Sequence, residues 1–244
     1  MISFLVLVFV VFYGVGAKIP PYIKVCKRDD PNLGPCIIQS IEFLRPKLKE
    51  GIPELNVPPL EPLPLDEIKL VSGPGAQIDA NITNLIVHGA SQFKITDLKP
   101  DLAKTRFLVQ FTIPTLYFEG DYDIDMNILV LKYKGKGPIT GNFTNYVFNC
   151  LLKADKIQKG NKTYIQFKKF ALTLHTGKSD ITLGGLFGDN GAILSAATNQ
   201  FLKENSDLFI DEIRPALENS LAEKFTNIAN SITSRFTYEE LFPK

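Results

Sequence analysis

The stretch GDYDIDMNI, residues 120–128, has the clearest pattern in the chain. Its apolar side chains alternate with acidic or amide ones, Tyr122, Ile124, Met126 and Ile128 against Asp121, Asp123, Asp125 and Asn127. A period of two places successive side chains on opposite faces of a strand. The stretch therefore predicts a strand of an antiparallel sheet that has one face in water and one face covered.

The same period recurs on both sides of this strand, between residues 68 and 186. Upstream, one face of each stretch collects the apolar residues Ile78, Ala80 and Ile82, and then Phe107, Val109, Phe111 and Ile113. Downstream, YVFNCLL (146–152), YIQFKKF (164–170) and LTLHT (172–176) read as further strands. A large antiparallel sheet with one apolar face follows.

Residues 193–236 read as one long helix that could cover this face. Its second half carries apolar residues at steps of three and four, namely Ile210, Ile213, Leu217, Leu221, Phe225, Ile228 and Ile232. Pro215 should kink this helix, because proline removes one backbone hydrogen bond. The economical arrangement is an α+β fold in which a strongly curved antiparallel sheet wraps the long helix, forming an elongated tube with an apolar tunnel.

A short helix and a proline-rich strap precede the sheet. Apolar residues keep helical spacing from Cys36 to Lys49, and Gly51 is placed to end that helix. The strap, GIPELNVPPLEPLPLDEI at 51–68, has five prolines and should run extended. Its interspersed Leu and Val residues predict contact with apolar surface along the outside of the tube.

The chain begins with an apolar run, ISFLVLVFVVFY at 2–13, followed by Val15 and Ala17. The run is too short for a membrane-spanning helix and predicts a signal peptide at 1–17, cut before Lys18. We therefore expect a secreted, extracellular protein, with residues 18–244 as a single domain and no stable membrane insertion.

Secretion determines how the cysteines and asparagines are interpreted. Cys26 and Cys36 flank a short polar loop and predict a disulfide. Cys150 shares a strand face with apolar residues, which favours a buried free thiol over an intermolecular disulfide. Three sequons predict glycosylation, at Asn81, Asn142 and Asn161.

Charge and motifs argue against several function classes. Lys and Arg total 27 and Asp and Glu 26, which indicates neither nucleic acid nor an anionic membrane as a partner. The two histidines, His88 and His175, lack metal-site spacing, and no nucleophile elbow or phosphate-binding loop is present. We therefore expect no enzyme, no metal and no cofactor.

Several short motifs together resemble the insect takeout and juvenile-hormone-binding protein family. They are the Cys26 and Cys36 pair, the proline-rich strap, HGAS at 88–91, GDYDID at 120–125, KGKGP at 134–138, LFGDN at 186–190 and EIRPAL at 212–217. Their order covers nearly all of 18–244. The resemblance implies a long helix wrapped by a curved sheet around an apolar tunnel. The chain lacks a second disulfide to the long helix, which makes it similar to the takeout branch.

The resemblance also implies a function: a haemolymph or other extracellular carrier of a small hydrophobic ligand, such as a juvenile-hormone-like isoprenoid or a fatty acyl chain. The resemblance also implies a link to circadian, feeding or other hormone-regulated behaviour. We expect a monomer, with a cell-surface receptor or a second carrier as a candidate partner. The alternative is a secreted signalling protein that acts through protein partners, with the tunnel region only as core.

The candidate tunnel residues are apolar side chains from the sheet and the long helix. They are Phe107, Val109, Phe111, Ile113, Tyr122, Ile124, Met126, Ile128, Phe148, Leu172, Leu174, Phe201 and Phe209. Alternation alone does not distinguish a tunnel wall from an ordinary packed core, so both interpretations stay open for each residue. The phenols of Tyr117, Tyr122, Tyr146 and Tyr164 are candidates to bind a polar end of the ligand.

Overall fold

The computed structural model describes residues 19–71, 77–128, 131–175, 177–187 and 191–244. The candidate signal peptide at 1–17 lies outside them. Within this part of the chain, no helix is long and apolar enough to cross a membrane.

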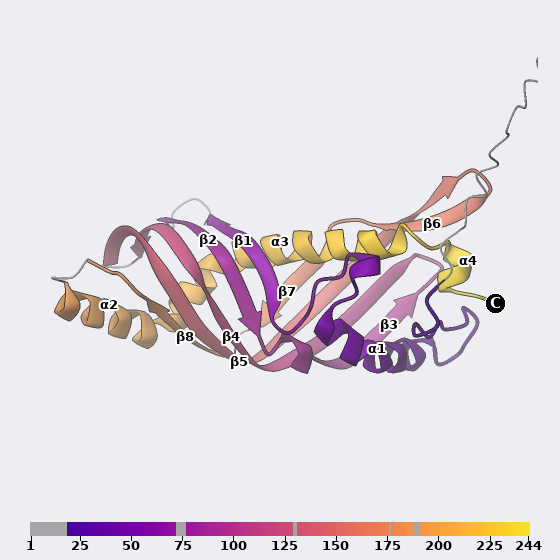
Figure 1. The fold of residues 1–244 in the computed structure, drawn as a ribbon, viewed down its shortest axis with the longest axis horizontal. Coiled ribbons are helices and arrows are strands. Elements are labelled where there is room, and N and C mark those ends of the chain that lie inside the picture. Colours follow the sequence, from indigo (N-terminus) through magenta and orange to yellow (C-terminus); the bar gives the residue numbers. More distant parts are fainter. Residues whose placement is uncertain (1–18, 72–76, 129–130, 176, 188–190) are drawn as a thin grey trace, which may run out of the picture.

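An eight-stranded antiparallel sheet forms most of the molecule (Figure 1). The strands are β1 (Leu63–Val71), β2 (Gln77–His88), β3 (Lys94–Asp101), β4 (Arg106–Ile128), β5 (Leu131–Lys159), β6 (Lys162–Phe167), β7 (Ala171–His175) and β8 (Lys178–Leu183). Neighbours run in the order β1, β2, β4, β5; β3 also pairs with β4, and β6, β7 and β8 all pair with β5. The long hairpin of β4 and β5 is paired from Arg106 opposite Lys153 to Ile128 opposite Leu131. It is the spine of the sheet.

The sheet curls into a half-barrel because its strands change register and side-chain parity at defined points. Asp66 in β1 and Asn84 in β2 have positive φ (53° and 52°), and each lies at a bulge. Asn145 in β5 also has positive φ (57°) and lies opposite Pro114, where the β4–β5 register skips one residue on each strand. Bulges increase local twist and bend a strand. At Gly120, a Cβ atom would lie 2.8 Å from the Thr83 carbonyl oxygen, so the bend requires glycine there.

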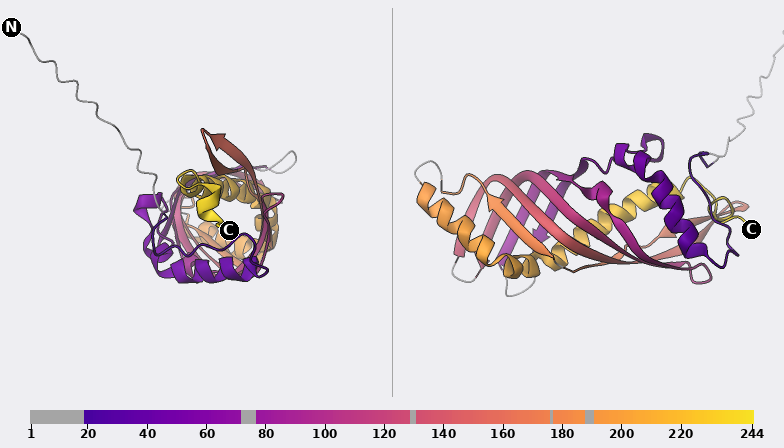
Figure 2. Two further views of the ribbon diagram at one scale, coloured as in Figure 1. Left: turned by 90° about the vertical axis from the view of Figure 1, so that its right-hand side faces the viewer. Right: turned by 90° about the horizontal axis from the view of Figure 1, so that it is seen from below.

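Helices occupy the ends and the open side of the half-barrel. They are α1 (Leu33–Glu50), α2 (Ala192–Glu204), α3 (Ser206–Thr233) and the single turn α4 (Tyr238–Leu241). In Figures 1 and 2, α2 lies at one end, α1 and α4 lie at the other, and α3 runs between them. The α+β class with a long C-terminal helix and a curved antiparallel sheet is confirmed.

The prediction of one continuous helix over 193–236 is wrong. The helix breaks at Asn205, which has φ −116° and ψ 25° and ends α2. The Asn205 side chain donates a hydrogen bond to the Phe201 carbonyl (2.8 Å), and its own carbonyl accepts from the Phe209 N–H (3.1 Å). Asn favours such helix ends because its side chain competes for backbone groups. Pro215 lies inside α3 and does not end it.

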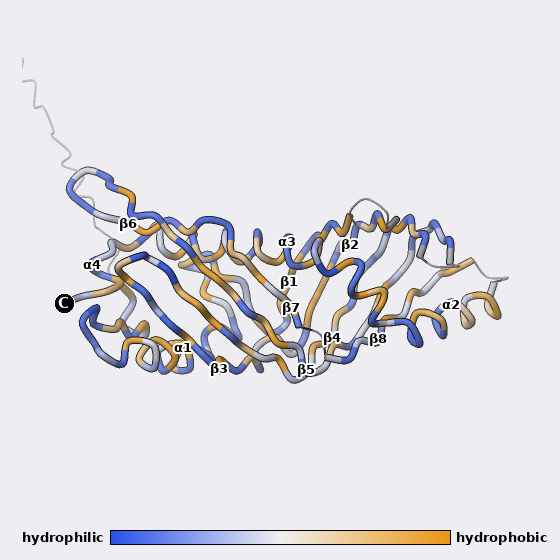
Figure 3. The backbone as a smooth tube through the Cα atoms, turned by 180° about the vertical axis from the view of Figure 1, so that it is seen from behind, coloured by the Kyte–Doolittle hydropathy of each residue, from blue (hydrophilic) through white to orange (hydrophobic). Residues whose placement is uncertain are grey.

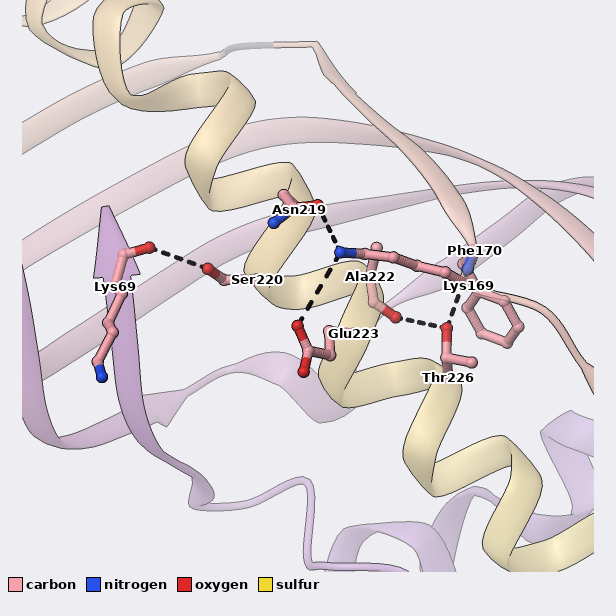
Figure 4. A network of polar contacts seen from close by, with 8 residues as sticks. All are labelled: Lys69, Lys169, Phe170, Asn219, Ser220, Ala222, Glu223 and Thr226. Atoms are coloured by element: carbon pink, nitrogen blue, oxygen red, sulfur yellow. Dashed lines mark hydrogen bonds and ion pairs between the residues drawn. The ribbon is translucent and has the colours of Figure 1, made fainter. Parts of the chain in front are cut away.

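Side chains of α2 and α3 pair with backbone groups at one edge of the sheet. The Asn230 amide accepts from the Phe167 N–H (2.7 Å) and donates to the Phe167 carbonyl (2.9 Å). Asn199 makes the same pair of bonds with Leu183 (both 2.9 Å). In addition, the Phe170 N–H donates to Thr226 Oγ1 (2.9 Å) (Figure 4).

At the opposite edge, the Ser220 hydroxyl of α3 donates to the Lys69 carbonyl of β1 (3.0 Å) (Figure 4). Helix α3 thus contacts strands at both edges of the curled sheet. It closes the half-barrel along its open side, and we call this line of contacts the seam.

The N-terminal part has the predicted disulfide, Cys26–Cys36, and the predicted helix end at Gly51 (φ 87°). The strap differs from the prediction of an extended segment on the outside of the tube. Residues Pro53–Leu55 form a 3-10 turn, and Leu63 to Leu65 already belong to β1. Strap residues Ile52, Leu55 and Val57 are buried together with Phe236, which lies beyond α3. Prolines exclude α-helix here, but 3-10 turns and strand starts tolerate them.

Removing one seam amide should destabilise the fold. We expect Asn230→Ala to lower the free energy of unfolding by about 1–3 kcal/mol, because it leaves the Phe167 N–H and carbonyl without their partner. The matched control is Asn227→Ala on the exposed side of the same helix, which should change stability by less than about 0.5 kcal/mol. Urea denaturation measures both, and equal losses would refute the role of the seam.

Candidate ligand-binding cavity

A cavity of about 460 Å³ lies between the inner face of the sheet and α3. Strands β1 to β5, β7 and β8 contribute side chains to its wall. Helix α3 contributes Phe209, Ile213, Leu217, Leu221, Ala222 and Phe225. At one end, Ile41 and Leu48 of α1 and Leu60 of the strap complete the wall. The cavity therefore extends along α3 under the closed half-barrel.

The wall stays apolar along each strand because parity shifts accompany the bends. In β1 the inward residues are Leu63 and Leu65 before Asp66, then Ile68 and Leu70 after it. The same shift occurs in β2 around Asn84, in β4 around Pro114 and in β5 around Asn145. A single extra or left-handed residue reverses the faces of all residues that follow. Each shift thus keeps the hydrophobic side chains inside a bending strand.

The hydroxyl groups in the wall are already bonded to the protein. Tyr122 donates to the Gly184 carbonyl (2.8 Å) and shares a hydrogen bond with the Tyr133 hydroxyl (3.0 Å). Tyr146 pairs with the Ser179 hydroxyl. Burial, reinforced by the bond to Tyr133, raises the pKa of Tyr122, and burial also raises the pKa of Tyr146. Both phenols are neutral, and they present their rings to the cavity.

Cys150 supplies the other polar atom of the wall. It is a free, half-buried thiol on β5. Burial raises its pKa to about 12, so the thiol is protonated at neutral pH and behaves as a small apolar group. The cavity surface is therefore hydrocarbon, aromatic ring and neutral sulfur.

Nine of the thirteen candidate tunnel residues line this cavity: Val109, Phe111, Ile113, Tyr122, Ile124, Phe148, Leu172, Leu174 and Phe209. The side chain of Ile128 lies outside the described residues. Phe107, Met126 and Phe201 lie elsewhere. Phe107 contacts Phe167 and Phe242, with ring centroids 6.2 and 6.1 Å apart, beyond the end of the cavity.

Met126 is almost fully buried in packed core, and Phe201 is half-buried on α2, beyond the helix break. On each side of Pro114, alternation along β4 correctly separates inward from outward residues, but it does not say how far the cavity extends. That limit depends on where the ends of the tube fill with side chains.

The period-two pattern missed wall residues on the far side of each parity shift from the residues it identified, among them Leu85, Val87, Leu116, Phe118 and Phe143. Their signals are Pro114 and the asparagines at Asn84 and Asn145, residue types that favour bends and left-handed backbone. It also missed Phe93 and Leu60, which lie outside regular alternation.

The remaining phenol candidates do not face the cavity. The Tyr117 hydroxyl donates to the Glu119 carboxylate (3.1 Å), and Tyr164 lies beneath the Lys159 ammonium, 5.3 Å from its ring centroid. Tyr122 and Tyr146 do face it, but their hydroxyls are engaged as described. The idea that a tyrosine anchors a polar ligand end is therefore not supported by these contacts.

Polar contacts hold α1 and the strap against the cavity. The Glu61 carboxylate accepts from the Gly89 N–H (2.9 and 3.1 Å) and from the Ser91 hydroxyl (3.1 Å). Arg45 of α1 donates to the Ser91 carbonyl and stacks 4.1 Å from the Phe93 ring centroid. These bonds position Leu60 and Phe93 in the wall. The HGAS motif thus acts as an anchor for the strap.

In the described part of the chain, metal-binding groups or histidines at the cavity would indicate chemistry other than apolar binding. No group of three or more His, Cys, Asp or Glu residues there is arranged to hold a metal ion. His88 lies 3.6 Å from Glu61 on the partly exposed side of β2, and His175 is exposed on β7. Neither reaches the cavity wall.

Comparison with known proteins agrees with this architecture. Takeout 1 of Epiphyas postvittana has the same fold in its crystal structure, with a TM-score of 0.76 and 20% identity over 91% of this chain and all of that one. Daywake of Drosophila melanogaster, a circadian clock-controlled protein, is 24% identical over 238 residues, covering 92% of this chain and 88% of that protein. A putative beta-carotene-binding protein of Schistocerca gregaria is 24% identical over 226 residues, covering 91% and 88%.

The family model for haemolymph juvenile hormone binding protein matches residues 4–243. That span includes the strap, the sheet, the cavity wall and the seam. Because the match covers nearly the whole chain, this protein belongs to the takeout and haemolymph juvenile hormone binding protein family.

Proposed function

We propose that this protein is an extracellular carrier that binds a small hydrophobic ligand in its cavity. The observation that carries the proposal is a space of about 460 Å³ whose walls are apolar and whose hydroxyls are all bonded to the protein. This volume is within the range of about 300–1,000 Å³ that small-molecule sites occupy. Such a site acts by burial, at about 25 cal/mol per Å² of apolar surface removed from water.

The ligand class follows from the wall. Among the described side chains of the wall, a molecule that lies fully inside meets phenol hydroxyls that are already bonded and one weakly donating thiol, so each buried polar group would cost free energy. We therefore infer a ligand that is mainly hydrocarbon, such as an isoprenoid or a long acyl chain. The relatives support this class, because juvenile hormone and β-carotene, which appear in their descriptions, are largely hydrocarbon.

Two observations support the extracellular role: the apolar sequence of residues 1–17 and the Cys26–Cys36 disulfide. The description of daywake as circadian clock-controlled supports a link to circadian behaviour. The role we propose is binding, not catalysis. Action solely through protein partners would suit a filled interior, and the cavity favours the carrier.

Blocking the cavity should abolish ligand retention. Val109 lines the cavity, and its neighbour Leu108 is 45% exposed on the outer face of the same strand. We expect Val109→Trp to fill part of the space and weaken binding at least about tenfold, while Leu108→Trp binds like the wild type. The measurement is mass spectrometry of organic extracts from protein purified out of insect-cell medium, with thermal unfolding as a check on folding.

A stoichiometric apolar compound in the wild type and the Leu108 variant, but absent from the Val109 variant, would support the carrier. An empty wild-type extract, together with no thermal stabilisation by isoprenoids or fatty acids, would overturn it.

The wall also predicts which end groups the site rejects. A terpene hydrocarbon should bind more tightly than its alcohol by about 1–3 kcal/mol, because the alcohol loses a hydrogen bond to water on burial. Tyr122→Phe should leave the affinity for both compounds within about threefold, since its hydroxyl is bonded to Gly184 and Tyr133. Fluorescence displacement titrations measure these affinities. Selective weakening of the alcohol by Tyr122→Phe would show that the phenol does bind ligand.

A further inference from the structure

The positive charge of this protein is concentrated in one hairpin. Residues 153–169 contain six lysines and one acidic residue, Asp155. The whole chain has a formal net charge of only +1, so the rest of the chain is net negative, by −4. The near-zero net charge of the whole sequence gives no sign of a charged surface, because the positive hairpin and the negative remainder cancel.

The hairpin consists of the end of β5 and all of β6, and it projects from the body of the tube (Figures 1 and 2). Much of it is hydrophilic in Figure 3. Its inner face packs against the C-terminal turn α4, through Ala154, Ile165 and Tyr238. This packing against α4 fixes the position of the hairpin and of its outer face.

The outer face carries two transverse pairs of lysines. Lys159 is directly opposite Lys162 in the β5–β6 register. Lys153 and Lys168 are opposite each other at the base, where the Lys168 N–H donates to the Lys153 carbonyl (2.9 Å). Residues directly opposite in antiparallel strands point to the same side. The two pairs are separated by about 20 Å along the strand.

Within the described residues, Lys153, Lys159 and Lys162 have no carboxylate partner. Elsewhere on the outer face of the sheet, lysines are neutralised across strands: Lys134 pairs with Asp125 and Lys136 with Asp123 (both 2.7 Å). In the hairpin Lys168 pairs with Asp155 in this way (3.2 Å), whereas Lys159 and Lys162 at the tip, and Lys153 at the base, depart from the arrangement. Like charges placed opposite each other destabilise a strand pair, so their presence indicates an anionic partner that offsets the repulsion.

We propose that the outer face of this hairpin binds a sulfated polysaccharide chain. The charges are spread in a line along a ribbon, which matches an extended polyanion, whereas a small anion would need converging donors. Lysines act as point charges and suit sulfate groups without a fixed geometry. The sequon at Asn161 lies in the hairpin turn, so a glycan there would hold a flat bilayer away from the lysines.

The test uses the full secreted protein and immobilised heparin as the probe, measured by surface plasmon resonance at about 0.05 M and about 0.15 M NaCl. We expect binding that weakens with salt. Lys159→Gln with Lys162→Gln should weaken it by about tenfold or more. The matched control, Lys134→Gln with Lys136→Gln, removes the same charge from β5 far from the hairpin and should change affinity less than about twofold.

All four lysines are exposed, so the variants should fold, and thermal unfolding checks this. No heparin binding by the wild type at low salt would overturn the proposal. Equal weakening by the two double variants would also overturn it, because binding would then follow net charge. Sedimentation with phosphatidylserine vesicles, in the absence of heparin binding, would instead identify an anionic membrane as the partner.

Discussion

A sheet that curls without closing leaves two edges of unpaired backbone groups, and the structure depends on how these edges are satisfied. Helix α3 lies along the opening, with Ser220 on one edge and Thr226 and Asn230 on the other. An Asn side chain carries both a donor NH2 group and an acceptor oxygen, so it can replace a neighbouring strand at one residue. The seam thus converts a half-barrel into a tube and protects its edges from pairing with other chains.

The position of α3 explains the hollow interior. Its polar face is used at the seam and its apolar face forms one wall, so the helix covers the sheet without filling the space inside. An empty apolar space forfeits the contacts that a packed core would make. A ligand of matching shape restores those contacts, so binding and folding stability should be coupled. The same feature that costs stability therefore creates affinity.

Sequence patterns predicted the main parts of this architecture because local periodicity determines which face of an element is buried. The strand at 120–128, the apolar stripe of the last helix and the Cys26–Cys36 disulfide all follow from short-range patterns. The bends do not. For Asn, the right-handed and left-handed backbone states are similar in energy. The curvature of the folded sheet therefore determines that Asn84 and Asn145 are left-handed. The break at Asn205, where the side chain bonds to the Phe201 carbonyl, also leaves no mark in the apolar periodicity, so the extent of the cavity wall could not be read from that pattern alone.

Strand β5 links the two surfaces on which function is proposed. Its inward residues Phe148 and Cys150 line the cavity, and the same strand continues into the lysine-bearing hairpin. Along this part of β5, inward and outward side chains keep the same parity from Tyr146 to Lys159, because no bulge interrupts the pairing. The apolar ligand and the anionic partner would therefore contact opposite faces of one strand. A partner on the outer face would leave the cavity wall in place, so the carrier could be retained at a polyanionic surface while its ligand stays bound.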